Sequence, residues 1–141
     1  MSTIRVFDTD RATNRSTVGR NSNDRMQRMQ IRHEEIESDI GLIYLKGRLD
    51  IMGVEKIELK FTAFSSTQRK SVIVDLSDVE LMNSVGLGML ISNAKTLRAH
   101  GKKMVLLKPD PHVQTVVEMA GVHELLPIEH DLTKAIARIK K

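Results

Sequence analysis

The chain of 141 residues contains no cysteine, no tryptophan, one tyrosine and three phenylalanines. The absence of cysteine excludes disulfides and thiolate metal sites, and it is typical of proteins in a reducing compartment. The scarcity of aromatic rings argues against a stacking platform for single-stranded nucleic acid. No apolar run approaches the ~20 residues that cross a bilayer, and the N-terminus lacks the apolar segment of a secretory signal. We therefore expect a cytoplasmic protein that does not enter a membrane.

Positive charge is concentrated near the N-terminus. The formal net charge is +4, and residues 1–29 hold six Arg and three Asp, so they contribute +3 and the remainder only +1. Residues 1–25 are rich in Ser, Thr, Asn, Asp and Arg and show no hydrophobic period, which predicts a disordered basic tail before a single domain at 26–141. Such a tail is either a solvated extension or a contact for nucleic acid or an acidic partner, and its composition favours the extension.

From residue 26 the apolar residues recur regularly. Short apolar or alternating segments predict strands, and apolar spacings of three and four predict helices. The predicted strands cover residues 26–36, 42–48, 72–75, 104–107 and 125–128, and the predicted helices begin near Gly53, Val85, Pro111 and Leu132. The order β-β-α-β-α-β-α-β-α predicts an α/β fold with an antiparallel first pair and parallel strands thereafter.

Ser84 stands directly before the second predicted helix, after a turn-rich segment that follows the 72–75 strand. This position predicts that Ser84 caps the helix, with its hydroxyl at the positive end of the helix dipole. A hydroxyl held there accepts a phosphate without destroying the helix. The alternative is that Ser84 is a cap and nothing more, since serine is common at that position. Farther along the same helix, Asn93 is predicted to face water.

The string Asn83-Ser84-Val85-Gly86-Leu87-Gly88 resembles the phosphoacceptor motif of STAS-domain anti-sigma-factor antagonists, usually Asp-Ser-Ser-Gly-Leu-Gly. The strings Val74-Asp75-Leu76-Ser77 and Gly47-Arg48-Leu49-Asp50 also resemble that family, and the similarity covers about 110 residues. The resemblance implies a small mixed β-sheet of about five strands, with about four helices mainly on one side.

Two positions depart from the family motif. The Asp that precedes the serine in the family is Asn83 here, and the second serine is Val85. Asn has the turn-forming shape of Asp but no charge. If the family carboxylate orients the hydroxyl, phosphorylation of Ser84 is slow or absent in this chain. The Val85 change leaves Ser84 as the single candidate phosphoacceptor of the motif.

The resemblance implies a non-enzymatic switch without a cofactor of its own. The unmodified form binds an anti-sigma factor with a histidine-kinase-like ATPase fold and so releases a sigma factor, and this serine kinase ends the binding by phosphorylating Ser84. A phosphoserine phosphatase is a further implied partner. The implied partner-binding residues are Arg48, Asp50, Met52, Asn83, Val85, Gly86, Leu87 and Met89. A constitutive STAS scaffold whose serine is never modified is the alternative, and Asn83 makes it credible.

Other chemistry has little support. The five histidines share no spacing that would bring metal ligands together, and we predict no metal site. The chain has no GxxxxGK[ST] or GxGxxG phosphate loop. A nucleic-acid-binding function through the basic tail is the third alternative, and the nearly neutral domain argues against it.

Overall fold

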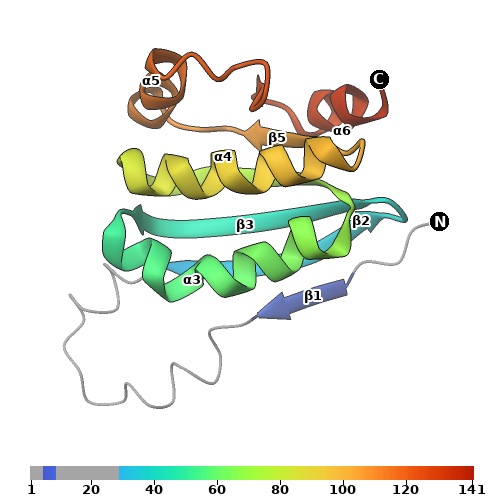
Figure 1. The fold of residues 1–141 in the computed structure, drawn as a ribbon, viewed down its shortest axis with the longest axis horizontal. Coiled ribbons are helices and arrows are strands. Elements are labelled where there is room, and N and C mark those ends of the chain that lie inside the picture. Colours follow the sequence, from blue (N-terminus) through green and yellow to red (C-terminus); the bar gives the residue numbers. More distant parts are fainter. Residues whose placement is uncertain (1–4, 9–28) are drawn as a thin grey trace.

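The computed structural model describes residues 5–8 and 29–141 of the chain (Figure 1). They form one six-stranded sheet in the order β1-β2-β3-β4-β5-β6. The strands are β1 (Arg5–Asp8), β2 (Gln30–Glu37), β3 (Ile40–Leu49), β4 (Ser71–Met82), β5 (Met104–Leu107) and β6 (Ile128–Glu129). The helices are α3 (Ile51–Phe64), the short 3₁₀ helix η1 (Ser66–Gln68), α4 (Ser84–Ala99), α5 (Pro111–Met119) and α6 (Leu132–Lys140).

The sheet is mixed, as the sequence predicts. β2 and β3 form an antiparallel hairpin, and β4, β5 and β6 follow β3 in parallel. Because parallel neighbours need a crossover, a helix leads from β3 to β4, from β4 to β5 and from β5 to β6. The predicted α/β class and the predicted element order are confirmed for residues 29–141. None of the helices in this part of the chain is long and apolar enough to span a bilayer.

Within the predicted basic tail, residues 5–8 form β1, which pairs antiparallel with β2 along the edge of the sheet. The composition of the tail did not predict this strand. The remaining tail residues lie outside the described part of the chain, and so does the predicted domain boundary at residue 26. The first strand of the hairpin begins at Gln30 rather than at Met26 as predicted.

β4 is longer than predicted, and the expectation of a turn-rich segment after residue 75 is wrong. The strand continues to Met82 because it pairs with β3 from Ile40 to Leu49 through two register shifts. Ser77, Asp78 and Glu80 in its second half are exposed, and the Asp75 carboxylate accepts hydrogen bonds from the amide and hydroxyl of Ser77. Val79 and Met82 meanwhile remain buried. The last predicted strand is also shifted, since β6 contains only Ile128 and Glu129.

The helix boundaries follow local capping chemistry. Asp110 accepts a hydrogen bond from Val113 N at 2.8 Å, and Pro111 occupies the first helical position of α5, both as predicted. Asp131 caps α6 through Lys134 N. α4 ends at Ala99, and Gly101 follows it with a φ of 73°, which suits a residue without a side chain.

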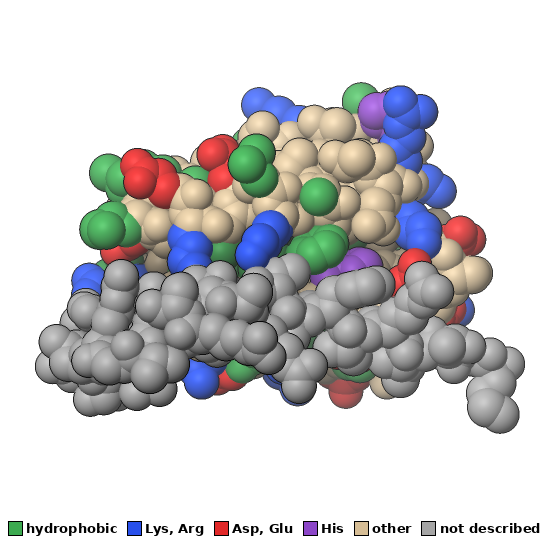
Figure 2. Space-filling view, turned by 90° about the horizontal axis from the view of Figure 1, so that it is seen from below, with side chains coloured by type: hydrophobic (Ala, Val, Ile, Leu, Met, Phe, Trp, Pro, Cys, Tyr) green, Lys and Arg blue, Asp and Glu red, His purple; other side chains and the backbone are tan. Residues whose placement is uncertain are grey.

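α3 turns one face to the sheet and the other to solvent. Val54, Ile57 and Phe61 lie on the buried face, at the predicted spacing. The outer face of this helix exposes Leu59, which is 87% accessible. Hydrophobic side chains are visible at the end of the molecule where α3 begins (Figure 2).

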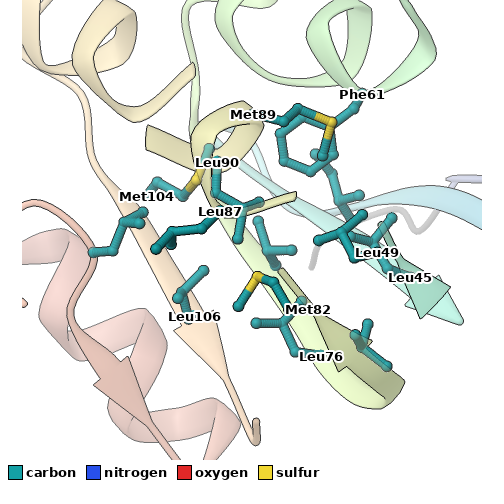
Figure 3. Packing of buried hydrophobic residues seen from close by; sticks show 14 of the residues in the cluster. Leu45, Leu49, Phe61, Leu76, Met82, Leu87, Met89, Leu90, Met104 and Leu106 are labelled. Atoms are coloured by element: carbon teal, nitrogen blue, oxygen red, sulfur yellow. The ribbon is translucent and has the colours of Figure 1, made fainter. Parts of the chain in front are cut away.

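The main core lies between the sheet and three of the helices. α3, α4 and α5 cover one face, and Figure 3 shows side chains of β3, β4 and β5 meeting those of α3 and α4. Alternate residues of β4 and β5 point to the other face, where Ile73 and Val105 pack with Ala135 of α6. The helices therefore lie mainly on one side, as the family resemblance implies.

Asn93 is buried rather than exposed, which corrects the sequence prediction. Its side-chain oxygen lies 2.9 Å from the hydroxyls of both Ser65 and Ser66, and its amide donates to Met89 O at 3.0 Å. These partners satisfy the buried amide and fix the end of α3 and the η1 turn against α4. The sequence showed a polar residue on a helix, but it did not show that the hydroxyls of Ser65 and Ser66 donate hydrogen bonds to it.

His33 supplies a pH-dependent contribution to stability. The ring stacks on Phe64 with 4.7 Å between centroids, and its residue is only 3% exposed. Burial lowers the pKa of His33 below its usual value, while nearby Glu35 opposes and Lys70 reinforces this shift. The unfolded chain, with a histidine pKa of about 6.5, therefore binds the proton more readily than the folded protein.

The unfolding free energy should consequently be highest above about pH 6.5 and should fall as the pH decreases toward the lowered pKa. His33→Phe keeps a flat ring against Phe64 and removes the titration. Denaturant unfolding at several pH values between 5.5 and 7.5 measures this effect. As the pH decreases, the unfolding free energy should fall more steeply in the original chain than in His33→Phe. Parallel curves for the two proteins would show that His33 does not titrate differently in the folded state.

Candidate functional site

The predicted site residues gather where β3 and β4 end and α3 and α4 begin. Both helices start at the same end of the sheet (Figure 1), because their strands are parallel. Asn83 N donates to Leu49 O at 3.3 Å, which joins the loop before α4 to the last residue of β3. This contact brings residues 50–52 beside residues 83–85.

Asn83, not Ser84, caps α4. The Asn83 side-chain oxygen accepts hydrogen bonds from Val85 N at 3.0 Å and from Gly86 N at 3.2 Å, and its backbone is extended. Ser84 is the first residue inside the helix. The prediction that Ser84 is the cap is therefore wrong. The sequence could not distinguish the two neighbours, because Asn and Ser are equally good N-cap residues. Ser84 is exposed, and its hydroxyl is not needed to cap the helix.

Asp50 performs the equivalent task for α3. Its carboxylate accepts a hydrogen bond from Gly53 N at 3.0 Å, and its second oxygen lies 3.8 Å from Arg48 Nε. The sequence placed both residues near Ser84 through the family resemblance, and the structure does bring them to this end of the sheet. The cap accounts for Asp50 structurally, and Arg48 remains exposed beside it.

Two glycines allow the helix starts to approach the end of β3. A Cβ atom on Gly53 would lie 2.1 Å from Arg48 O, and one on Gly86 would lie 2.3 Å from Leu49 O. Real Cβ atoms do not approach backbone oxygens so closely. Gly86, which was predicted to bind a partner, is instead buried at a contact between elements.

Leu87 and Met89 were also predicted to bind a partner, and the structure places them in the core. They are only 6% and 4% exposed, and Figure 3 shows Met89 beside Phe61 of α3. The helical period explains this placement, since residues three and four apart share one face. The outward positions of the first turns are those of Ser84, Val85 and Gly88.

Exposed apolar side chains lie in the first turns of α3 and α4. Ile51 is 56% exposed, Met52 78% and Val85 39%. We call the group formed by Ile51, Met52, Ser84 and Val85 the helix-start surface. Met52 and Val85 are among the residues predicted to bind a partner, and Ile51 is not. Ile51 follows the Asp50 cap directly and lies outside the apolar stripe of α3. This position could have indicated that its side chain is exposed.

The helix-start surface combines one hydroxyl with apolar contact area, and none of its four residues is charged. Arg48 at its rim is already close to the Asp50 carboxylate. Within the described residues, no three His, Asp or Glu side chains are arranged to hold a metal ion. The arrangement is suited to protein contact, because it pairs adaptable apolar groups such as Met52 with a modifiable hydroxyl.

The fold and the helix-start surface thus define a small mixed-sheet α/β domain that presents one serine hydroxyl among exposed apolar side chains. Residues 31–135 match the sequence model of the STAS domain. The chain belongs to the STAS domain family.

Its relatives include BtrV of Bordetella bronchiseptica, provisionally named an anti-sigma factor antagonist. The two are 28% identical over 96 residues, which cover 68% of this chain and 83% of the relative. The structure resembles that of the anti-sigma factor antagonist SpoIIAA in its unphosphorylated form, with a TM-score of 0.63 and 25% identity over 78% of this chain and 96% of SpoIIAA.

An anti-sigma factor antagonist from Mycobacterium paratuberculosis has the same fold. Its TM-score is 0.72 at 18% identity, and the match covers 82% of this chain and 97% of the other.

Gly86→Ala should lower the unfolding free energy by about 1–3 kcal/mol, because the new methyl group meets Leu49 O. Gly88→Ala is the matched control on the same helix. A Cβ there has nothing within 4 Å, so this variant should gain about 0.5–1 kcal/mol from better helix propensity. Denaturant unfolding of both variants measures the difference. Equal stabilities would contradict the close approach of α4 to β3.

Proposed function

We propose that this chain is an anti-sigma-factor antagonist whose unmodified form binds an anti-sigma factor through the helix-start surface, and that phosphorylation of Ser84 ends the binding. The observation that carries the proposal is the exposed Ser84 hydroxyl at the first position of α4, outside the Asn83 cap and beside exposed apolar side chains. The names of the relatives support the same function.

The proposed partner is an anti-sigma factor with a histidine-kinase-like ATPase fold, as the family resemblance implies. This partner, acting as a serine kinase, supplies ATP and Mg²⁺, and a phosphoserine phosphatase restores the unmodified form. Ile51, Met52 and Val85 provide apolar contact area, and Arg48 lies at the rim beside the Asp50 carboxylate. Leu87 and Met89 support the surface from within the core and do not touch the partner.

The proposed switch is electrostatic. Phosphorylation adds about −1.5 to −2 charges at pH 7, directly beside Val85 and across from Met52. Burying that charge against apolar groups is costly, and Arg48 is already close to Asp50. In the free protein the same charge lies at a helix N-terminus, where it is tolerated. Phosphorylation therefore removes the partner without unfolding the domain.

Asn83 supports a second candidate, a constitutive STAS scaffold that is not phosphorylated. The family acid is absent, and Asn83 is fully used as a cap through Val85 N and Gly86 N. On the other hand, an uncharged cap does not repel an adjacent phosphate, whereas an aspartate would. Asn83 is thus less suited than an aspartate to assist phosphate transfer to Ser84, but it repels the attached phosphate less. Substitutions at Ser84 and at Asn83 distinguish the two candidate functions.

Ser84→Asp should weaken binding of the cognate anti-sigma factor about tenfold or more, which corresponds to 1.4 kcal/mol or more. Ser84→Ala should bind like the original chain. Because Asn83 is the cap, Ser84→Ala should change stability by less than about 0.5 kcal/mol. Isothermal titration calorimetry with each variant tests the switch. If the Asp and Ala variants bound equally well, the electrostatic account would be wrong.

Asn83→Asp restores the family acid with almost the same shape. If this carboxylate assists phosphate transfer, the variant should be phosphorylated faster by the cognate kinase. Its stability should rise by about 0.3–1 kcal/mol, since a negative cap suits the helix dipole. A time course by intact-protein mass spectrometry measures the rate. Identical rates would show that the acid is dispensable, and no phosphorylation in either protein would favour the constitutive scaffold.

A further inference from the structure

A basic cavity lies at the opposite end of α4 from Ser84. Its volume is about 610 Å³, within the range of small-molecule sites. It opens where α4 ends, where β5 begins and where α6 approaches (Figure 1). Ser84 and Arg98 are separated by fourteen residues of helix, or about 21 Å. The cavity is therefore separate from the helix-start surface.

A complete helix-ending motif builds one wall of this cavity. Gly101 N donates to Arg98 O at 3.0 Å, and Lys102 N donates to Leu97 O at 2.8 Å. The left-handed Gly101 reverses the chain, so that Lys102 and Lys103 follow the end of the helix directly into the sheet. This turn places their side chains along the same cavity as Arg98.

The cavity lining carries an excess of positive charge. The cations are Arg98, Lys102, Lys103, Arg138 and Lys141, and the one acidic side chain among the lining residues is Glu124. Arg138 is paired with Glu129 at 2.6 Å, and Lys103 Nζ donates to the Arg138 carbonyl at 3.2 Å. Arg98 and Lys102 have no ion-pair partner within 29–141. Arg98 and Lys102 are thus two uncompensated cations that line one cavity.

The remaining lining is apolar. Ala94 and Met104 are buried in the main core and form the inner part, and Leu125 and Pro127 line the cavity from the segment before β6. A polar anion such as sulfate would leave this part of the cavity without a favourable contact. The lining therefore matches a ligand with a negative end and an apolar body.

We propose that this cavity binds a small phosphate monoester with an apolar or aromatic body. A phosphate dianion matches the two uncompensated cations, because a guanidinium and an ammonium together supply charge and several donors. The body of the ligand packs on Leu125 and Pro127, which are only partly buried. Binding in this cavity needs neither Ser84 nor the anti-sigma factor. The cavity and the proposed switch can therefore be tested independently.

Phenyl phosphate is the probe, titrated into the full-length chain by calorimetry at constant ionic strength. It should bind about tenfold or more tightly than inorganic phosphate or phenol, since only it uses both the cations and the apolar lining. Ser84→Asp should bind it as well as the original chain does. Equal affinities for phenyl phosphate and inorganic phosphate would overturn the proposal, and so would the absence of any binding.

Matched variants test the location. Arg98→Gln with Lys102→Gln should weaken phenyl phosphate binding about tenfold or more. Lys46→Gln with Lys95→Gln removes the same net charge from exposed positions outside the cavity, and it should change the affinity less than about twofold. Thermal unfolding confirms that both double variants fold. Equal weakening in both would show that net charge, not this cavity, attracts the probe.

Discussion

The close contact of two helix starts with the end of one strand is the constraint on which the site depends. α3 and α4 both begin against the last two carbonyls of β3, and only glycine at positions 53 and 86 leaves room for this approach. The caps at Asp50 and Asn83 then satisfy the first amides of each helix. The exposed side chains of the first turns are thereby held side by side, which places Ser84 among Ile51, Met52 and Val85 without any long loop.

Local signals in the sequence predicted much of the fold. The order of strands and helices, the caps at Asp110 and Asp131 and the terminating Gly101 depend on neighbouring residues only, so they could be inferred directly. The length of β4 could not, because its polar second half is extended through pairing with β3. The burial of Asn93 likewise depends on serines of another element. Pairing and packing over long sequence distances decide these features.

The structure changes the detail of the predicted site, whose function stays a prediction. The family motif located Ser84, yet it could not distinguish a cap from its neighbour, because both Asn83 and Ser84 are good caps. A sequence motif also does not show which of its residues are buried. In the helix, Met89 faces the core and Val85 faces solvent. Ile51 was missed for the opposite reason, since it lies outside the motif and becomes a neighbour of Ser84 only through the Leu49–Asn83 contact.

We propose that Ser84 is the residue whose phosphorylation switches the protein. Ser77 is exposed too, but its hydroxyl is engaged by Asp75 at 2.7 Å, and Ser92 lies two turns along α4. The most direct measurement is tandem mass spectrometry of the protein after incubation with its cognate kinase and ATP, with each phosphate located to a residue. Our account predicts that Ser84 alone is phosphorylated within residues 29–141. Phosphate on Ser77 or Ser92, with Ser84 unmodified, would contradict it.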